Sequence, residues 1–293
     1  MIPAVCAAAM LLAACSGAGD DATDSTGSPP DSGAPWPLTG LASDGEADVD
    51  APVVVVKVDN VDAAFPQIGL DVADIVVEEP VEGGVTRLAV LAQSDVDTTV
   101  GPVRSVRSSD SGIVAPANGV LVASGGAPEA LADLEAAGVQ TALDGSTPGF
   151  ERDSSRPSPH NLFVDLEQAY PAIEAEADGP PGPYFEFGDA DVLESDDAAS
   201  AGDITLTYSD AHTTRLLFDG EAWTRELATP DGFVADTVIA LSVEQGTAGY
   251  LDPSGAPVPI NLTEGVGNGW LAHAGRIVEI EWTKAEADDT WSF

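Results

Sequence analysis

Residues 53–58 read Val-Val-Val-Val-Lys-Val, a nearly continuous run of β-branched side chains. Such a run is typical of a strand covered on both faces, because a strand with one wet face would alternate apolar and polar residues. Two more strands are predicted at residues 74–79 and 86–92, separated by a glycine turn at residues 82–86. The first part of the chain is therefore predicted to build a buried sheet with polar segments at its strand ends.

The next stretch alternates strands with helices. Residues 119–123 predict a strand, residues 124–126 a glycine turn, and residues 128–137 a helix with proline near its start and Gly138 just past its end. A strand is predicted at residues 160–165, followed by a helix at 166–177 that we expect to be interrupted near Pro171. This mixture favours an α/β or α+β N-terminal domain with a mixed sheet, spanning residues 37–178.

A change of composition marks the second half. Residues 179–203 are rich in proline, glycine and acidic side chains, which predicts a linker without core residues. Beyond it the pattern is that of strands alone, and residues 276–282 alternate apolar with acidic side chains, as a half-buried strand does. We therefore predict a smaller, mainly-β C-terminal domain at residues 204–293. Its strand-like ending predicts that the natural chain continues beyond Phe293.

The charge balance excludes one class of partner. The chain has 293 residues with Asp+Glu 50 and Lys+Arg 10, a formal net charge of −40, while 44% of its residues are hydrophobic. That apolar content and length are sufficient for two packed domains. Phosphate backbones require clustered lysine and arginine, so we do not expect binding to DNA or RNA.

The amino terminus predicts export. Residues 4–14 form an apolar segment of the length found in signal peptides, too short to span a bilayer. The segment ends in Leu12-Ala13-Ala14-Cys15, which resembles a bacterial lipobox and implies cleavage before Cys15, acylation of that cysteine with palmitate or a similar chain, and anchoring to the outer face of the cytoplasmic membrane or in the periplasm.

The residues around that segment extend the prediction. Residues 1–15 would be the lipoprotein signal peptide and lipobox. Residues 16–36, rich in Gly, Ser, Asp and Pro, would be a disordered tether. Because the first cation of the chain is Lys57, whereas signal peptides begin with a positively charged region, we expect the true start to lie upstream of Met1.

The scarce cations predict a functional site. Six of the ten lie between Lys57 and Arg156, and the arginines among them occupy polar segments marked by glycine or serine. A guanidinium fork is suited to carboxylate or phosphate. We expect the polar residues of this region to converge at one edge of the sheet. The candidates are Asp59, Asn60, Glu78, Glu82, Arg87, Arg104, Arg107, Arg152, Arg156, His160 and Asn161.

Two interpretations of this cluster stay open at the level of sequence. The residues can form an internal ion-pair network that holds loops, or they can line a cleft for an anionic or polar cell-wall ligand such as a glycan, a peptide carboxylate or a phosphate. We favour the binding cleft.

Other functional classes have weaker signals. A cell-wall hydrolase could use Glu78 and Glu82, or one of Ser105, Ser108, Ser109 and Ser111 with His160, but no nucleophile motif frames these serines. An envelope scaffold could dock a protein partner through the C-terminal domain, with Trp223, Trp270 or Trp282 as anchors. No metal or cofactor site is predicted, because His160, His212 and His273 are far apart and no metal-binding spacing occurs. An enzyme is thus less expected than a binding protein.

Several of these segments together resemble one family. Residues 58–60, 65–70, 73–78, 81–87, 101–107 and 159–162 are similar to the YerB-like lipoproteins, bacterial envelope proteins with a domain of unknown function and a separate C-terminal domain. The resemblance runs from about Pro37 to the end and is strongest up to Val164. It implies the lipobox, the two-domain division and a further C-terminal segment. It implies no activity, because the family has none established.

Overall fold

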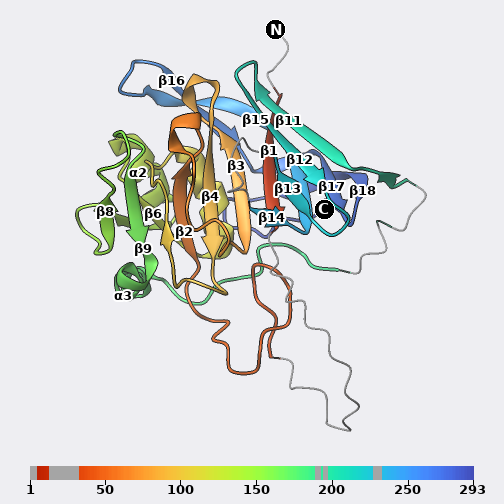
Figure 1. Ribbon diagram of the computed structural model, residues 1–293, viewed down its shortest axis with the longest axis horizontal. Coiled ribbons are helices and arrows are strands. Elements are labelled where there is room, and N and C mark those ends of the chain that lie inside the picture. The colour runs from red at the N-terminus through yellow and green to blue at the C-terminus, as the bar shows by residue number, and fades with distance from the viewer. Residues whose placement is uncertain (1–4, 13–32, 189–192, 194–196, 227–232) are drawn as a thin grey trace.

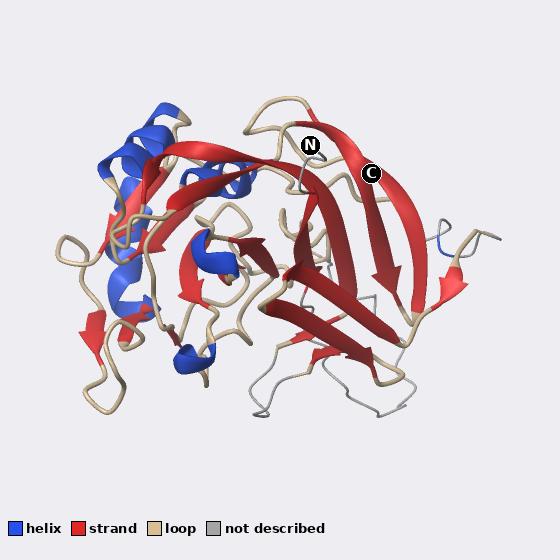
Figure 2. Ribbon diagram, turned by 90° about the horizontal axis from the view of Figure 1, so that it is seen from above, coloured by secondary structure: helices blue, strands red, loops and turns tan. Residues whose placement is uncertain are grey.

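The computed structural model describes residues 5–12, 33–188, 193, 197–226 and 233–293. One 11-stranded sheet runs through both halves of the chain, in the order β10-β18-β17-β15-β1-β3-β4-β2-β6-β7, with β16 paired to β15 (Figure 1). The helices gather at the end of the molecule that holds the N-terminal strands, and strands dominate the other end (Figure 2). No helix in the described part of the chain is long and apolar enough to cross a membrane.

The N-terminal half contributes the mixed part of this sheet. Strand β2 pairs in parallel with β6, and β6 pairs in parallel with β7, whereas β4 is antiparallel to both β2 and β3. The strands are β2 (Val54–Asp59), β3 (Ile75–Pro80), β4 (Thr86–Ala92), β6 (Val120–Ala123) and β7 (Gln140–Leu143), and a separate three-stranded sheet contains β5 (Thr99–Val100), β9 (Leu162–Asp165) and β8 (Phe150–Arg152).

Short helices connect these strands. The α-helices are α1 (Ser111–Val114), α2 (Pro128–Ala136) and α3 (Leu166–Glu176), and the 3-10 helices are η1 (Asp62–Ala64), η2 (Glu82–Gly84), η3 (Ser108–Asp110) and η4 (Ala115–Ala117). Helix α2 begins at Pro128, whose missing N–H costs nothing there, and Gly138 follows it with a φ of 74° that suits glycine.

The C-terminal half is built mainly of antiparallel strands. It adds β10 (Ala199–Ser200), β15 (Thr237–Leu251), β16 (Pro257–Leu262), β17 (Gly265–His273) and β18 (Arg276–Lys284) to the large sheet, and it forms a four-stranded sheet from β11 (Asp203–Ser209), β12 (His212–Phe218), β13 (Trp223–Arg225) and β14 (Val234–Ala235). The predicted fold class, an N-terminal domain with a mixed sheet and helices followed by a mainly-β domain, is confirmed.

Strand β1 (Val5–Leu12) lies in the middle of the large sheet. It pairs antiparallel with β15 over eight positions, from Val5 opposite Glu244 to Leu12 opposite Thr237, and with β3 over four. This is the apolar segment that the sequence predicts to be part of a signal peptide. The predicted acylation site Cys15 and residues 16–32 of the predicted tether lie outside the described residues.

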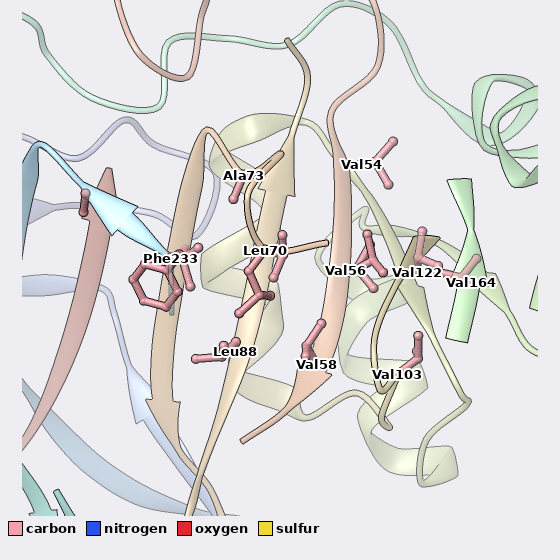
Figure 3. Packing of buried hydrophobic residues seen from close by; sticks show 14 of the residues in the cluster. Val54, Val56, Val58, Leu70, Ala73, Leu88, Val103, Val122, Val164 and Phe233 are labelled. Carbon is pink, nitrogen blue, oxygen red and sulfur yellow. The ribbon is translucent and has the colours of Figure 1, made fainter. Parts of the chain in front are cut away.

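The run of valines packs on both faces, as predicted. Val54, Val56 and Val58 point into one core, where the four-stranded sheet contributes residues such as Trp223 (Figure 3 shows the valine side of this core). Val53 and Val55 point into the other core. Successive side chains of a strand alternate between faces, so the sheet separates two cores that both halves of the chain help to fill.

Two local predictions were wrong. Helix α3 continues through Pro171, because Leu166, Ala169 and Ile173 on its inner face are buried in the core. The segment predicted to be a linker without core residues supplies two buried aromatic side chains, Tyr184 and Phe185, which pack in the core that contains Trp291.

Candidate functional site

A polar edge forms where the three parallel strands end. Asp59 is the last residue of β2, Ser124 follows β6 and Asp144 follows β7. In open α/β sheets this carboxyl edge is the usual place for ligands. The loop that contains Arg104 is held between β2 and β6, because the N–H of Arg104 donates to Lys57 O at 2.8 Å and the N–H of Ser124 donates to Arg104 O at 3.0 Å. The loop that contains Arg104 and the ends of β2 and β6 therefore meet at this sheet edge.

Asp59 is the centre of this edge. Its Oδ2 atom lies 2.7 Å from Nδ1 of His160 and 3.1 Å from Nε of Arg104. The carboxylate is buried, whereas the side chains of Arg104 and His160 remain 24% and 19% exposed. A carboxylate at Nδ1 favours the tautomer with the proton on that nitrogen, which leaves Nε2 as the acceptor. Within the described residues, Nε2 of His160 has no hydrogen-bond partner.

A second group surrounds Glu82. Arg107 donates from Nε to Glu82 Oε2 at 2.7 Å and also bonds Oε1 through Nη2, while Arg87 Nη2 lies 3.5 Å from Oε1. Arg87 also donates to Ser105 O at 2.8 Å. Partial burial would raise the pKa of Glu82, but the two guanidinium groups outweigh burial and lower the pKa. Both arginines are buried, so this group serves as an internal ion-pair network.

Glu78 lies on the face of the sheet opposite to Asp59. The side chains of adjacent β3 residues alternate between the two faces, and it is Glu79 that lies on the Asp59 face. Its buried carboxylate accepts hydrogen bonds from Asn60, Thr86 and Thr214 at 2.8–2.9 Å. Nε2 of His212 lies 3.0 Å from Oε1, and Arg225 lies 3.8 Å away. Burial alone would raise the pKa of Glu78, yet the contact with His212 and the charge of Arg225 lower it. The carboxylate is therefore held ionised inside the molecule.

Sequence reasoning missed much of the Glu78 group. His212 was named only as a histidine far from the other two, but its side chain is partly buried against Glu78. Thr214 and Arg225 were not singled out at all. Thr214 faces inward in β12, where exposed and buried residues alternate, and this alternation could have identified it as buried. Nothing in the local sequence indicates which carboxylate a buried threonine contacts.

Lys57 forms another group that the sequence analysis did not anticipate. The lysine is fully buried on the Asp59 face and bonds both Glu79 and Asp110, at 2.5 Å for Asp110. Asn261 of β16 adds a hydrogen bond to Glu79 Oε2 at 2.9 Å. Burial alone would lower the pKa of Lys57, but the two carboxylates reverse the effect and raise it. This group ties the C-terminal half to the N-terminal sheet.

Arg152 lies between the polar edge and a cavity. Its side chain is 54% exposed and lies 3.3 Å from Asp144 and 3.2 Å from Asn161 Oδ1. It lines a cavity of about 510 Å³ on the small three-stranded sheet. The other lining residues include two phenylalanines and three acidic side chains: Ile68, Thr99, Gly149, Phe150, Glu151, Asp153, Phe163, Asp165 and Gln168.

Arg156 lies beside this cavity and is held in place by three contacts. It lies 3.5 Å from Asp153, donates to Ala64 O at 3.1 Å, and stacks over the ring of Phe163 at 5.0 Å. The eleven candidates thus divide into the exposed edge around Asp59, the Arg152 cavity, and two buried groups around Glu78 and Glu82.

The hydrolase alternatives require the two glutamates to lie together, or a serine to lie beside His160. Glu78 and Glu82 belong to separate groups and share no partner within the described residues. Ser105 Oγ lies 3.3 Å from Ser124 Oγ, whereas Ser108 and Ser109 are buried. None of the four candidate serines hydrogen-bonds His160 in the part of the chain that the structure describes. His160 with Asp59 is a His–carboxylate pair whose partly exposed imidazole is arranged for proton transfer.

The described residues contain no group of three or more His, Cys, Asp or Glu side chains that could hold a metal ion. Among the predicted tryptophan anchors, Trp223 and Trp282 are buried in the cores, and Trp270 is exposed.

Comparisons with known proteins agree with the two-part architecture. Residues 38–179 match the model described as "Protein of unknown function (DUF3048) N-terminal domain", and residues 196–293 match the corresponding C-terminal domain. A Bacillus subtilis (strain 168) protein named "Putative lipoprotein YerB" is 31% identical over 264 residues, which cover 84% of this chain and 77% of that protein. The crystal structure of YerB from Bacillus subtilis superposes with a TM-score of 0.65 at 25% identity, covering 88% of this chain and 91% of the other.

Proposed function

This chain belongs to the DUF3048 family of proteins of unknown function, and we propose that it is an exported, lipid-anchored binding protein. Its ligand would be a polar or anionic molecule of the cell envelope, bound at the edge around Asp59 and in the adjoining Arg152 cavity. The name of the Bacillus relative supports the lipoprotein assignment. The sequence Leu12-Ala13-Ala14-Cys15 supports acylation of Cys15 after export.

The observation that carries the binding proposal is the exposure of Arg152 beside a cavity of mixed character. The cavity of about 510 Å³ has Ile68, Phe150 and Phe163 on part of its wall and polar or charged side chains, Arg152 among them, on the rest, so it offers both apolar contact and hydrogen-bond partners. Arg152 offers donors to a carboxylate or phosphate, and the acidic and amide side chains offer partners to hydroxyl groups. These partners suit a wall glycan or its peptide stem.

Two partly exposed side chains beyond the cavity, Arg104 and His160, extend this surface. Arg104 and His160 share one oxygen of Asp59, which fixes both side chains without burying them. A ligand that spans the cavity and the edge would meet them in a prearranged position, which reduces the ordering cost of binding. Arg87 and Arg107 would act indirectly, by holding the loop that carries Arg104.

Charge reversal tests the binding proposal. We expect Arg152→Glu and Arg104→Glu to lower the capture of purified peptidoglycan fragments about tenfold or more, measured by co-sedimentation and calorimetry, because each loses a charge-assisted hydrogen bond. Arg215→Glu is the matched control, because Arg215 is also partly exposed but pairs with Asp203 and Glu226 in the C-terminal half. Unchanged capture by a folded Arg152→Glu protein would disprove the proposal.

The pair of Asp59 and His160 favours a second candidate, a wall hydrolase. Oriented by Asp59, the imidazole could accept a proton from a water molecule through Nε2. Incubation with purified peptidoglycan and detection of released fragments decides between the two functions. A hydrolase would release fragments and lose that activity in His160→Gln, whereas a binding protein would capture peptidoglycan without releasing any.

Anchoring has its own test. We expect Cys15→Ala to move the protein from the membrane fraction to the soluble exported fraction and to abolish incorporation of labelled palmitate. Retention in the membrane fraction with no incorporated label in the unmodified protein would contradict acylation.

A further inference from the structure

Strand β17 carries an exposed tryptophan, Trp270. Its indole lies in the middle of β17 and is 49% exposed, whereas Trp223, Trp282 and Trp291 are buried. Exposing so large an apolar ring to water is unfavourable, and tryptophan is the residue most enriched at binding hot spots. The ring is therefore a candidate anchor that the cores do not account for.

The neighbouring strand surrounds this ring with carboxylates. Glu279 of β18 is directly opposite Trp270, and Glu281 is directly opposite Asn268. Because residues two apart on a strand share a face, these four side chains lie on the same surface of the sheet. On the other side of Trp270, β15 places the small residue Ala240 opposite it.

A hollow of about 780 Å³ lies over these residues. It is lined by Asp197, Ala199, Asn268, Trp270, Ile277, Val278, Glu279, Ile280 and Glu281, hereafter the Trp270 groove. Glu279, Glu281 and Asp197 are exposed, and none of the described lining residues is lysine or arginine. The described lining residues therefore present negative charge beside an aromatic ring.

The chemistry of the groove selects a cation. The face of an indole attracts ammonium and guanidinium groups, tryptophan most strongly of the aromatic residues. The carboxylates accept the hydrogen bonds that such a group offers. An anionic ligand would be repelled. The chain uses the same kind of contact internally, since Lys284 lies 5.3 Å from the ring centre of Trp291.

We propose that the Trp270 groove binds a basic peptide segment of a partner protein, with a lysine side chain over the indole of Trp270 and its ammonium group bonded to Glu279 and Glu281. The groove, at about 780 Å³, is larger than one ammonium group requires, which suits a segment that places several side chains in it. This site is separate from the Arg152 cavity, which lies on the N-terminal half and would take ligands of a different charge.

Calorimetric titration of the full chain with a tetralysine peptide tests the proposal. We expect Trp270→Ala to weaken the affinity about two- to fivefold, the contribution of an exposed cation–π contact. Glu279→Gln with Glu281→Gln should weaken it further and reduce its dependence on salt. The double variant Glu174→Gln with Glu176→Gln removes the same charge from exposed positions of α3 and should bind like the unmodified protein.

Three results would overturn the proposal. Equal affinity of Trp270→Ala and the unmodified protein would show that tetralysine responds only to the net charge. An equal loss in the α3 control would show the same. Binding of chitotetraose at Trp270 without binding of tetralysine would assign the groove to glycans instead. If Trp270→Ala fails to fold, the Glu279 and Glu281 variant decides the question by itself.

Discussion

At the scale of single residues, buried charges with assigned partners are the main feature of this molecule. Glu78 and Lys57 are both fully buried, and each is surrounded by groups of opposite charge or by hydrogen-bond partners. Such arrangements gain little over apolar packing but become costly when one partner is removed. The two residues therefore give the sharpest tests of the network.

Glu78 predicts a dependence of stability on pH. The folded protein holds the pKa of Glu78 below its ordinary value of 4.5. Its contribution to stability is therefore complete above pH 4.5 and is lost as the pH falls through the lower folded value. We expect Glu78→Gln to reduce the free energy of unfolding at pH 7 by roughly 1.5–3 kcal/mol, with the deficit shrinking in acid.

Urea unfolding at several pH values measures this difference. Glu174→Gln, at an exposed position of α3, should follow the unmodified protein throughout. A deficit that stays constant down to the acid limit would show that the charge of Glu78 is not what stabilises the fold.

Lys57 predicts a large loss when its charge is removed. Lys57→Met would leave Glu79 and Asp110 buried without their cation, so we expect a loss of about 3–5 kcal/mol in urea unfolding. Arg152→Met removes a cation from an exposed pair and should cost less than about 1 kcal/mol. Similar small losses for both variants would refute the role of the buried group.

At the scale of elements, local patterns predicted most of the fold. The valine run gave β2, the proline and glycine positions gave α2, and the alternation in residues 276–282 gave β18. These features depend on neighbours in sequence. The grouping of Glu78 with Thr214 and Arg225 depends on contacts across more than a hundred residues, and no local periodicity encodes such a partner. For the same reason the sequence could not separate exposed from paired arginines.

Helix α3 offers a test at this scale. Asp165 precedes the helix and accepts the N–H of Gln168 at 3.1 Å, which satisfies one of the free donors of the first turn. We expect Asp165→Ala to lower the free energy of unfolding by about 1 kcal/mol, while Asp165→Asn retains most of it. Thermal unfolding measures both, and equal losses for Ala and Asn would argue against a capping role.

At the scale of the whole molecule, the large sheet joins the two family domains. Strands β3 and β15 come from different halves of the chain, and β1 lies between them. Groups such as Asn261 with Glu79 add further contacts across the same boundary. The order of strands therefore makes the stability of each half depend on the other.

Removal of β1 tests this dependence. A protein that begins at Cys15, as the proposed processing would produce, lacks the strand that pairs with β3 and β15. We expect faster amide hydrogen exchange at residues 75–78 and 237–244 and a lower midpoint of thermal unfolding, because backbone groups there lose their partners. Residues of β17 and β18 serve as the internal reference. Unchanged exchange at β3 and β15 would show that the shorter protein closes its sheet by other means.

The contacts around Glu78 also limit modularity. A chimera that joins the N-terminal half of this chain to the C-terminal half of a relative would need a hydroxyl group at the position of Thr214 and a cation at that of Arg225. Without them the chimera would enclose an unneutralised carboxylate. The two halves are thus exchangeable only as a matched pair, although each corresponds to its own family domain.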